Sequence, residues 1–138
     1  MGHPFRIDRV LFATDLSPAS DPALRCAVTL ATRFNADLYL LHVVPPASGE
    51  GAAVEAMRRL RHDLLATHDQ YAVTAILSGE PAARIVQKAE DIRADLIVMG
   101  TSTRCPRHGG LTDTVLRSAS CPVLAVPHAR HEAAEVQP

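Results

Sequence analysis

Tryptophan is absent from this sequence, aromatic residues make up only 4% of it, and neither sign of charge is in excess. The 14 lysines and arginines are balanced by 15 aspartates and glutamates, for a formal net charge of −1. Proteins that bind nucleic acid or an anionic membrane surface through their charge carry a basic patch. The composition therefore indicates no nucleic-acid partner and no membrane partner.

Long apolar runs and paired cysteines are also missing. No segment approaches the length of a membrane-spanning helix, and residues 1–8 lack the apolar core of a signal peptide. The three cysteines include no Cys-x-x-Cys pair, which argues against a disulfide framework and fits reduced thiols. We therefore expect a cytoplasmic protein. Its 138 residues, 47% of them apolar, suffice for one globular domain with a substantial core.

Five short apolar runs alternate with stretches of helical periodicity. The runs predict strands at residues 9–14, 37–44, 71–77, 96–99 and 122–126. In the first and the fourth, residues 10–12 and 96–99 are apolar without interruption, as in a parallel sheet covered on both faces. Helices are predicted at residues 22–34, 53–67 and 81–92, and a short one begins near 111, with Leu111, Val115 and Leu116 on one side. This alternation predicts one doubly wound parallel α/β domain, residues 1–126, with helices on both faces of the sheet. The pattern leaves the strand order open, and we expect the polar tail, 127–138, to be disordered.

The polar loop after the fourth predicted strand, from Gly100 to Gly110, is the richest candidate for a ligand site. Backbone N–H groups in a glycine-bearing loop, followed by a helix N-terminus, can hold an anion. Ligands of doubly wound sheets lie outside the carboxyl ends of the strands, where Asp15 also falls. A strand-to-helix turn needs glycine for backbone reasons as well, and that is the commoner explanation of such a loop.

Five motifs, in register over residues 9–126, resemble the universal stress protein family. They are Phe12-Ala-Thr-Asp-Leu-Ser-Pro-Ala-Ser, Leu40-Leu-His-Val-Val, Gly79-Glu-Pro, Asp95-Leu-Ile-Val-Met-Gly-Thr and Cys121-Pro-Val-Leu-Ala-Val. The resemblance implies a Rossmann-like sheet of strand order 3-2-1-4-5, a role in stress response, and a homodimer paired through the strand from Cys121 to Val126. It also implies an adenine-nucleotide site, with adenine beside the first two strands, ribose near Asp15, and phosphates on the loop from Gly100.

Nucleotide-binding members of that family carry a Gly-x2-Gly-x9-Gly-Ser/Thr signature in this loop, and the sequence departs from it. Gly100 matches the first glycine and Gly109 the third. Thr103 replaces the second glycine, Gly110 replaces the hydroxyl residue, and only residues 104–108 fill the longer spacing. A β-branched residue resists positive φ and keeps the backbone farther from a phosphate. The shorter loop also cannot wrap a triphosphate in the same way.

The resemblance thus predicts an altered nucleotide site, in which the residues matched to adenosine are kept and those matched to the phosphates are not. Its predicted members are Ala13, Thr14, Asp15, Val43, Gly100, Thr101, Thr103, Gly109 and Gly110. We expect weak adenine-nucleotide binding, with ATP or AMP as ligand, no required cofactor, and ATP binding more readily lost than kept. Arg104, Arg107 and His108 could supply charge to a phosphate, although solvated loop charges are commoner. For Asp15, capping of the following segment is a hypothesis of nearly equal weight.

Other chemical motifs are sparse. Cys105 and His108 have the spacing of two metal ligands, short of the four that a structural zinc site needs. Cys105 is also a candidate redox thiol because its loop is basic, although an inert surface cysteine is the commoner case. His42, within a buried strand, is interpreted as a hydrogen-bonded core histidine. There is no nucleophile elbow and no carboxylate pair at acid–base spacing, so the sequence predicts no enzyme.

Two functions of different classes remain open. The first is a stress-response dimer whose pocket senses or carries an adenine nucleotide, with feeble hydrolysis as a variant of that hypothesis. The second is a nucleotide-free dimer that presents its helical faces to a protein partner, which the sequence does not identify. Whether the short loop still binds nucleotide is the feature that separates them.

Overall fold

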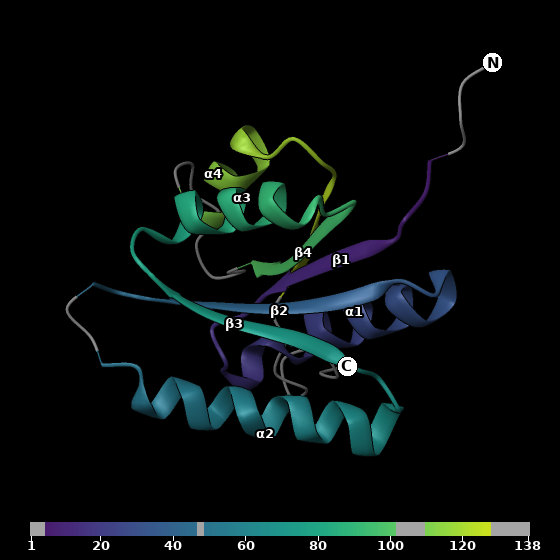
Figure 1. Cartoon of the computed structure of the whole chain (residues 1–138). Helices are drawn as coiled ribbons and strands as arrows, with labels where there is room; N and C mark the ends of the chain where they lie inside the picture. The colour runs from purple at the N-terminus through teal and green to yellow at the C-terminus, as the bar shows by residue number, and fades with distance from the viewer. Residues whose placement is uncertain (1–4, 47–48, 102–109, 128–138) are drawn as a thin grey trace, which may run out of the picture.

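The computed structural model describes residues 5–46, 49–101 and 110–127, and within them every predicted strand and helix is present (Figure 1). In chain order the elements are β1 (Arg9–Ala13), η1 (Pro18–Ser20), α1 (Asp21–Phe34), β2 (Asp37–Val44), α2 (Gly51–His68), β3 (Ala72–Ser78), α3 (Pro81–Ile92), β4 (Leu96–Thr101), α4 (Leu111–Ser118) and β5 (Val123–Pro127). The predicted disordered tail, apart from Pro127, lies outside the described residues. No helix among the described residues is long and apolar enough to cross a membrane.

The five strands form one parallel sheet in the order β3-β2-β1-β4-β5, which confirms the predicted topology. β1 lies at the centre, paired with β2 on one side and β4 on the other. Its Val10, Leu11 and Phe12 are fully buried, as an apolar run covered on both faces requires. The winding reverses at β1, and Ala13 pairs with Leu41 of β2 and Met99 of β4, so the carboxyl ends of these three strands meet.

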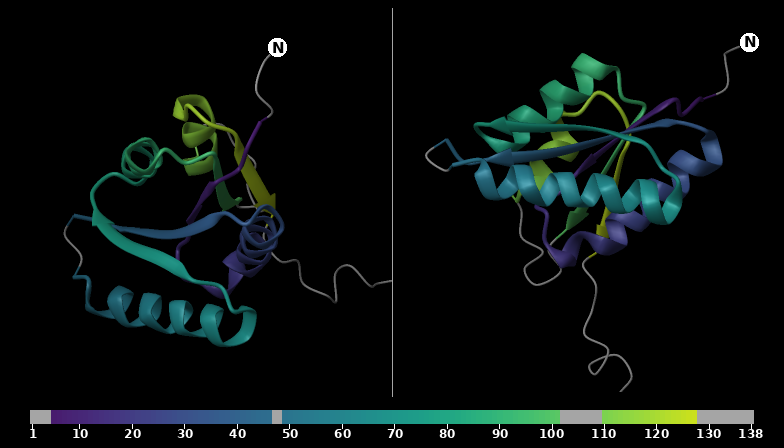
Figure 2. Two further views of the ribbon diagram at one scale, coloured as in Figure 1. Left: turned by 45° about the vertical axis from the view of Figure 1, so that its right-hand side comes forward. Right: turned by 60° about the horizontal axis from the view of Figure 1, so that its bottom comes forward.

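The helices form two layers, with α1 and α2 on one face of the sheet and α3 and α4 on the other (Figures 1 and 2). Because successive side chains of a strand point to opposite faces, β1 contributes to both cores. Val10 and Phe12 pack with α1 and α2, whereas Leu11 and Ala13 pack with α3 and α4. The sheet is therefore held between two separate apolar layers.

The helix ends follow from local chemistry. Pro22 stands in the first turn of α1, where its missing N–H is not needed. Asn35 ends α1 in the left-handed conformation (φ 54°), and its N–H reaches the carbonyls of Ala31 and Thr32. Asp69 and Arg93 end α2 and α3 in the same way, with φ of 52° and 57°.

Only one of the three apolar residues on the predicted side of α4 is fully buried. Val115 is fully buried, but Leu111 is 43% exposed and Leu116 is 50% exposed. α4 has only eight residues and packs beside α3, so a single position faces the core. Residue 116 lies one position, about 100° around the helix, from that buried line.

Candidate functional site

A crevice of about 260 Å³ opens at the carboxyl ends of β1, β2 and β4, where the winding of the sheet reverses. This is the place where doubly wound sheets bind their ligands. Twelve residues line it: Ala13, Thr14, Asp15, Ser20, Leu41, His42, Val43, Pro81, Ile85, Met99, Gly100 and Leu111. Five of the nine predicted site residues are among them, namely Ala13, Thr14, Asp15, Val43 and Gly100.

The floor of the crevice is apolar. Ala13, Leu41 and Met99 belong to the buried core on the α3 side of the sheet, and Ile85 of α3 is 3% exposed. Among the described residues, no buried side-chain nitrogen or oxygen lacks a hydrogen-bond partner. A floor of this kind suits the face of a flat, largely apolar ring, with polar groups confined to the rim.

Asp15 stands on the rim, and its carboxylate organises the turn after β1. Oδ1 accepts hydrogen bonds from the Ser17 backbone N–H at 2.9 Å and from the Ser17 and Ser20 hydroxyls, both at 2.7 Å. The local capping hypothesis for Asp15 is therefore an observed role. These bonds also fix the direction of the carboxylate beside the crevice. Binding of a ribose by this carboxylate remains a prediction.

The turn is tied to β2 by two further hydrogen bonds. The Thr14 N–H donates to the Leu41 carbonyl at 2.9 Å, and His42 Nδ1 lies 2.9 Å from the Thr14 carbonyl oxygen. A carbonyl only accepts, so Nδ1 carries the proton of this bond. His42 is thus hydrogen-bonded as predicted, and it holds the turn that carries Asp15.

On the β4 side, the structure separates the predicted residues. Gly100 lines the crevice, and its carbonyl accepts a hydrogen bond from the Thr112 hydroxyl at 3.2 Å, which links β4 to the start of α4. Thr101 pairs with Pro127 of β5 and does not line the crevice. Gly110 precedes α4 as its N-cap and lies outside the lining as well.

Thr103 and Gly109 fall in residues 102–109, outside the described residues, together with Arg104, Cys105, Arg107 and His108. The predicted residues that meet in the crevice are therefore the four matched to adenosine, Ala13, Thr14, Asp15 and Val43, together with Gly100.

Gly110 is not required by its own backbone. Its φ is −71°, an ordinary value for any residue, and a Cβ built there would meet no heavy atom within 4 Å. The surrounding space would therefore accommodate a serine side chain in place of Gly110. A serine there could also cap α4, whose N-cap makes no side-chain hydrogen bond.

The charge of the crevice is sparse. Asp15 is the one acidic residue among its described lining, and no lysine or arginine lines it. A phosphate in the described part of the crevice would meet no cationic side chain. Among the described residues there is also no group of three or more histidines, cysteines or acidic residues placed to hold a metal ion.

Cys121, which precedes β5, has a pKa raised above its ordinary value. Burial is the main cause, and the negative charge of Asp95 adds to it. Asp95 is itself held by the backbone N–H groups of Asp8 and Arg9, at 2.8 and 3.0 Å. Cys121 stands before the amino end of β5, whereas the crevice lies at the carboxyl ends of the strands, so this thiol is not part of the crevice.

A model of the universal stress protein family matches residues 6–127 of this chain. The chain belongs to the universal stress protein family. A universal stress protein of Methanocaldococcus jannaschii is 32% identical over 143 residues, an alignment that covers 90% of this chain and 84% of that protein.

Solved structures of universal stress proteins share the fold. One, in complex with cAMP, superposes with a TM-score of 0.75 at 21% identity and covers 90% of this chain and 99% of its own. The Archaeoglobus fulgidus protein in complex with dAMP gives 0.68 at 22% identity, over 89% and 99% of the two chains. At this identity the likeness establishes the five-stranded α/β architecture.

Sequence reasoning missed the α3 side of the site. Pro81, Ile85 and Leu111 were predicted only as members of helices. Met99 was predicted as part of a strand without a role at its end. The sequence signal for Met99 was its place as the last residue of the fourth predicted strand, because the carboxyl ends of parallel strands meet at one edge of the sheet.

Proposed function

We propose that this universal stress protein is a small cytoplasmic homodimer without enzymatic activity, whose crevice binds an adenine nucleotide weakly through its adenosine end. The observation that carries this proposal is the apolar crevice at the switch point of the sheet, with Asp15 fixed on its rim. Its floor suits a purine face, and a carboxylate on the rim can accept hydrogen bonds from ribose hydroxyls.

Relatives in complex with cAMP and dAMP support an adenine ligand. The first is the cyclic monophosphate of adenosine and the second the monophosphate of 2′-deoxyadenosine, so neither needs a cradle for three phosphates. In this chain the described lining offers adenosine an apolar floor and one carboxylate, but it offers a phosphate no cation. The affinity should therefore come from the nucleoside and change little with the number of phosphates.

The phosphate side argues for weak binding of ATP. A phosphate is held well when several backbone N–H groups converge on it and a helix N-terminus faces it. Here Thr103 stands at a glycine position of the family signature, and four residues are missing from the loop. Gly110 brings no hydroxyl to the start of α4.

The absence of catalysis is proposed because the described crevice lacks an activated nucleophile. The two serine hydroxyls near its rim, Ser17 and Ser20, donate to the Asp15 carboxylate and not to His42, the one histidine in the described lining. His42 Nδ1 is engaged with the Thr14 carbonyl. These contacts stabilise the turn beside the crevice and do not activate a nucleophile.

The dimer is proposed from the β5 edge. β5 pairs only with β4 among the described strands, so its outer edge presents unpaired backbone groups. Leu124 of β5 is 37% exposed, and beside it lies an apolar groove of about 630 Å³ against α1. Natural proteins cover or pair such an edge, and a second copy of β5 would do so.

Calorimetry with AMP, ADP and ATP, each with and without Mg²⁺, tests the nucleotide proposal. We expect dissociation constants of ~0.1 mM or weaker, about 5 kcal/mol, with AMP at least as tight as ATP. Ala13→Leu, which would fill the floor, should abolish binding, whereas Ala52→Leu at an exposed position of α2 should not. Micromolar, Mg²⁺-dependent ATP binding would contradict the proposed weakness of the loop and support an ATP-sensing protein. No binding of any of the three would favour the nucleotide-free interaction protein.

A further inference from the structure

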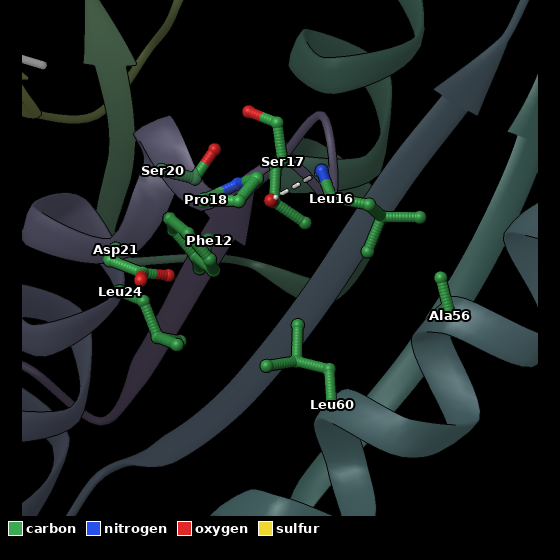
Figure 3. Close-up of a pocket in the computed structure, with 10 residues that line it drawn as sticks. Phe12, Leu16, Ser17, Pro18, Ser20, Asp21, Leu24, Ala56 and Leu60 are labelled. Atoms are coloured by element: carbon green, nitrogen blue, oxygen red, sulfur yellow. Dashed lines mark hydrogen bonds between the residues drawn. The ribbon is translucent and has the colours of Figure 1, made fainter.

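A second cavity, of about 220 Å³, lies on the opposite face of the sheet from the nucleotide crevice (Figure 3). It is lined by the end of β1, the turn and η1 after it, the start of α1, and the middle of α2, and it opens to the surface. Its lining is Phe12, Thr14, Leu16, Ser17, Pro18, Ser20, Asp21, Leu24, Ala56 and Leu60. We propose that this α2 cavity binds a small organic cation, a primary ammonium attached to a short apolar body.

The inner wall of the α2 cavity fits the apolar body. Phe12 is fully buried beneath it, and the side chains of Leu24 and Leu60 extend toward one another across the space (Figure 3). Ala56 contributes only a methyl group on the α2 side, which leaves room. A dry cavity of roughly 150 Å³ accommodates benzene. The α2 cavity is therefore large enough for one aromatic ring or a short branched chain.

The rim of the α2 cavity fits the ammonium because it offers acceptors and few donors. The hydroxyl protons of Ser17 and Ser20 are both committed to Asp15 Oδ1, so these hydroxyls present only lone pairs to a ligand. Asp21, in the first turn of α1, is exposed and its carboxylate has no hydrogen bond or ion pair within the described part of the chain. An ammonium carries three donors and the opposite charge. The Asp21 carboxylate would repel an anion in the same position.

The wall is built before a ligand arrives. Leu16 adopts φ 66°, a left-handed conformation that is unfavourable for a bulky side chain. It is held there by the hydrogen bond from its N–H to the Thr14 hydroxyl, 2.9 Å long, and by packing of its side chain against the α1–α2 core. A conformation of this kind persists only where its surroundings determine it. A ligand would therefore not have to order the turn, which lowers the cost of binding.

Amide chemical shifts of the full-length protein, followed during titration with 2-phenylethylamine, test the proposal. The uncharged 2-phenylethanol and the anionic 3-phenylpropionate serve as matched probes. We expect the amine to shift the amides of Leu16, Ser17 and Ala56 with a dissociation constant on the order of 1 mM. The alcohol should bind about two- to fivefold more weakly, the range for an exposed ion pair, and the carboxylate should not bind.

Two variants separate the wall from the rim. Ala56→Leu should fill the cavity and reduce binding of amine and alcohol by at least about tenfold, whereas Ala66→Leu, on an exposed face of the same helix, should change neither. Asp21→Asn should remove the preference for the amine and leave the alcohol unchanged, with the exposed Asp63→Asn as its control. The proposal is overturned by unshifted amides at 10 mM amine, about ten times the expected dissociation constant, by equal affinity for amine and alcohol, or by shifts that survive in Ala56→Leu.

Discussion

Replacement of Asp15 by alanine and by asparagine separates the two roles that this residue can have. Its carboxylate organises the turn after β1, which is observed, and is proposed to hold the ribose of a nucleotide. Alanine removes both roles. Asparagine keeps an acceptor at the Oδ1 position and loses the charge, so it should preserve most of the turn while weakening the contact to ribose.

The stability cost follows from the three hydrogen bonds that Oδ1 accepts, at 2.9, 2.7 and 2.7 Å. A hydrogen bond contributes roughly 0.5–1.5 kcal/mol net, and these lie at the exposed surface, where the lower value applies. Asp15→Ala should therefore lower the free energy of unfolding by about 1.5 kcal/mol. Asp15→Asn should lower it by less than about 0.5 kcal/mol, measured in both cases by urea denaturation.

Binding gives the second readout. If the carboxylate accepts the ribose hydroxyls, Asp15→Asn should weaken AMP binding about tenfold, equivalent to 1.4 kcal/mol, a value at the low end for a bond to a charged group. The 2′,3′-dideoxy analogue of AMP should bind the wild type and Asp15→Asn equally, because it has no ribose hydroxyl to lose. Wild-type affinity of Asp15→Asn for AMP would refute the ribose role and leave Asp15 as a turn residue alone.

Three further predictions concern the dimer, the loop and a thiol. Leu124→Lys should give monomers in sedimentation, and a wild type already monomeric at micromolar concentration would end the dimer proposal. A triple variant that combines Thr103→Gly, Gly110→Ser and a four-residue insertion after His108 should bind ATP. Each change alone should have little effect, because backbone amides hold a phosphate only when several converge. A well-folded triple variant that does not bind ATP in calorimetry would contradict this. Because the pKa of the Cys121 thiol is raised, its alkylation by iodoacetamide should be slow near pH 7 and accelerate only at alkaline pH, and rapid labelling of that peptide at pH 7 would contradict its burial.

The strands of the sheet were predictable because the burial of each strand shows in its own residues. The runs around Leu11 and Ile97 are apolar without interruption and short, which is typical of a strand covered on both faces. The strand order required the family resemblance, since alternation of strands and helices fits several topologies. α4 could not be placed as well, because a helix of eight residues leaves its buried side to be decided by its neighbour α3.

The candidate site was predictable only where it follows the ends of strands. Ala13, Asp15 and Gly100 stand at such ends, so the switch-point rule and the family motifs both indicate them. Pro81 and Ile85 reach the same crevice from α3, and their contribution depends on how far the helix overhangs the sheet. The sequence pattern carries no measure of that distance.

The left-handed conformation of Leu16 had no signal in the sequence either, because positive φ is expected of glycine or asparagine and not of a bulky leucine. The α2 cavity had no signal in the sequence either, because its size depends on the gap between η1 and the small side chain of Ala56.

One turn forms a wall of both cavities. Thr14 and Ser20 line the nucleotide crevice and the α2 cavity alike, while Asp15 lines only the first and Leu16 only the second. Hydrogen bonds fix the turn at both ends, through His42 at the Thr14 carbonyl and through Asp15 at the Ser20 hydroxyl. Because these hydrogen bonds hold the turn without a ligand, the two cavities share a preformed wall. If a ligand in one cavity changes the affinity of the other, the effect must be reciprocal.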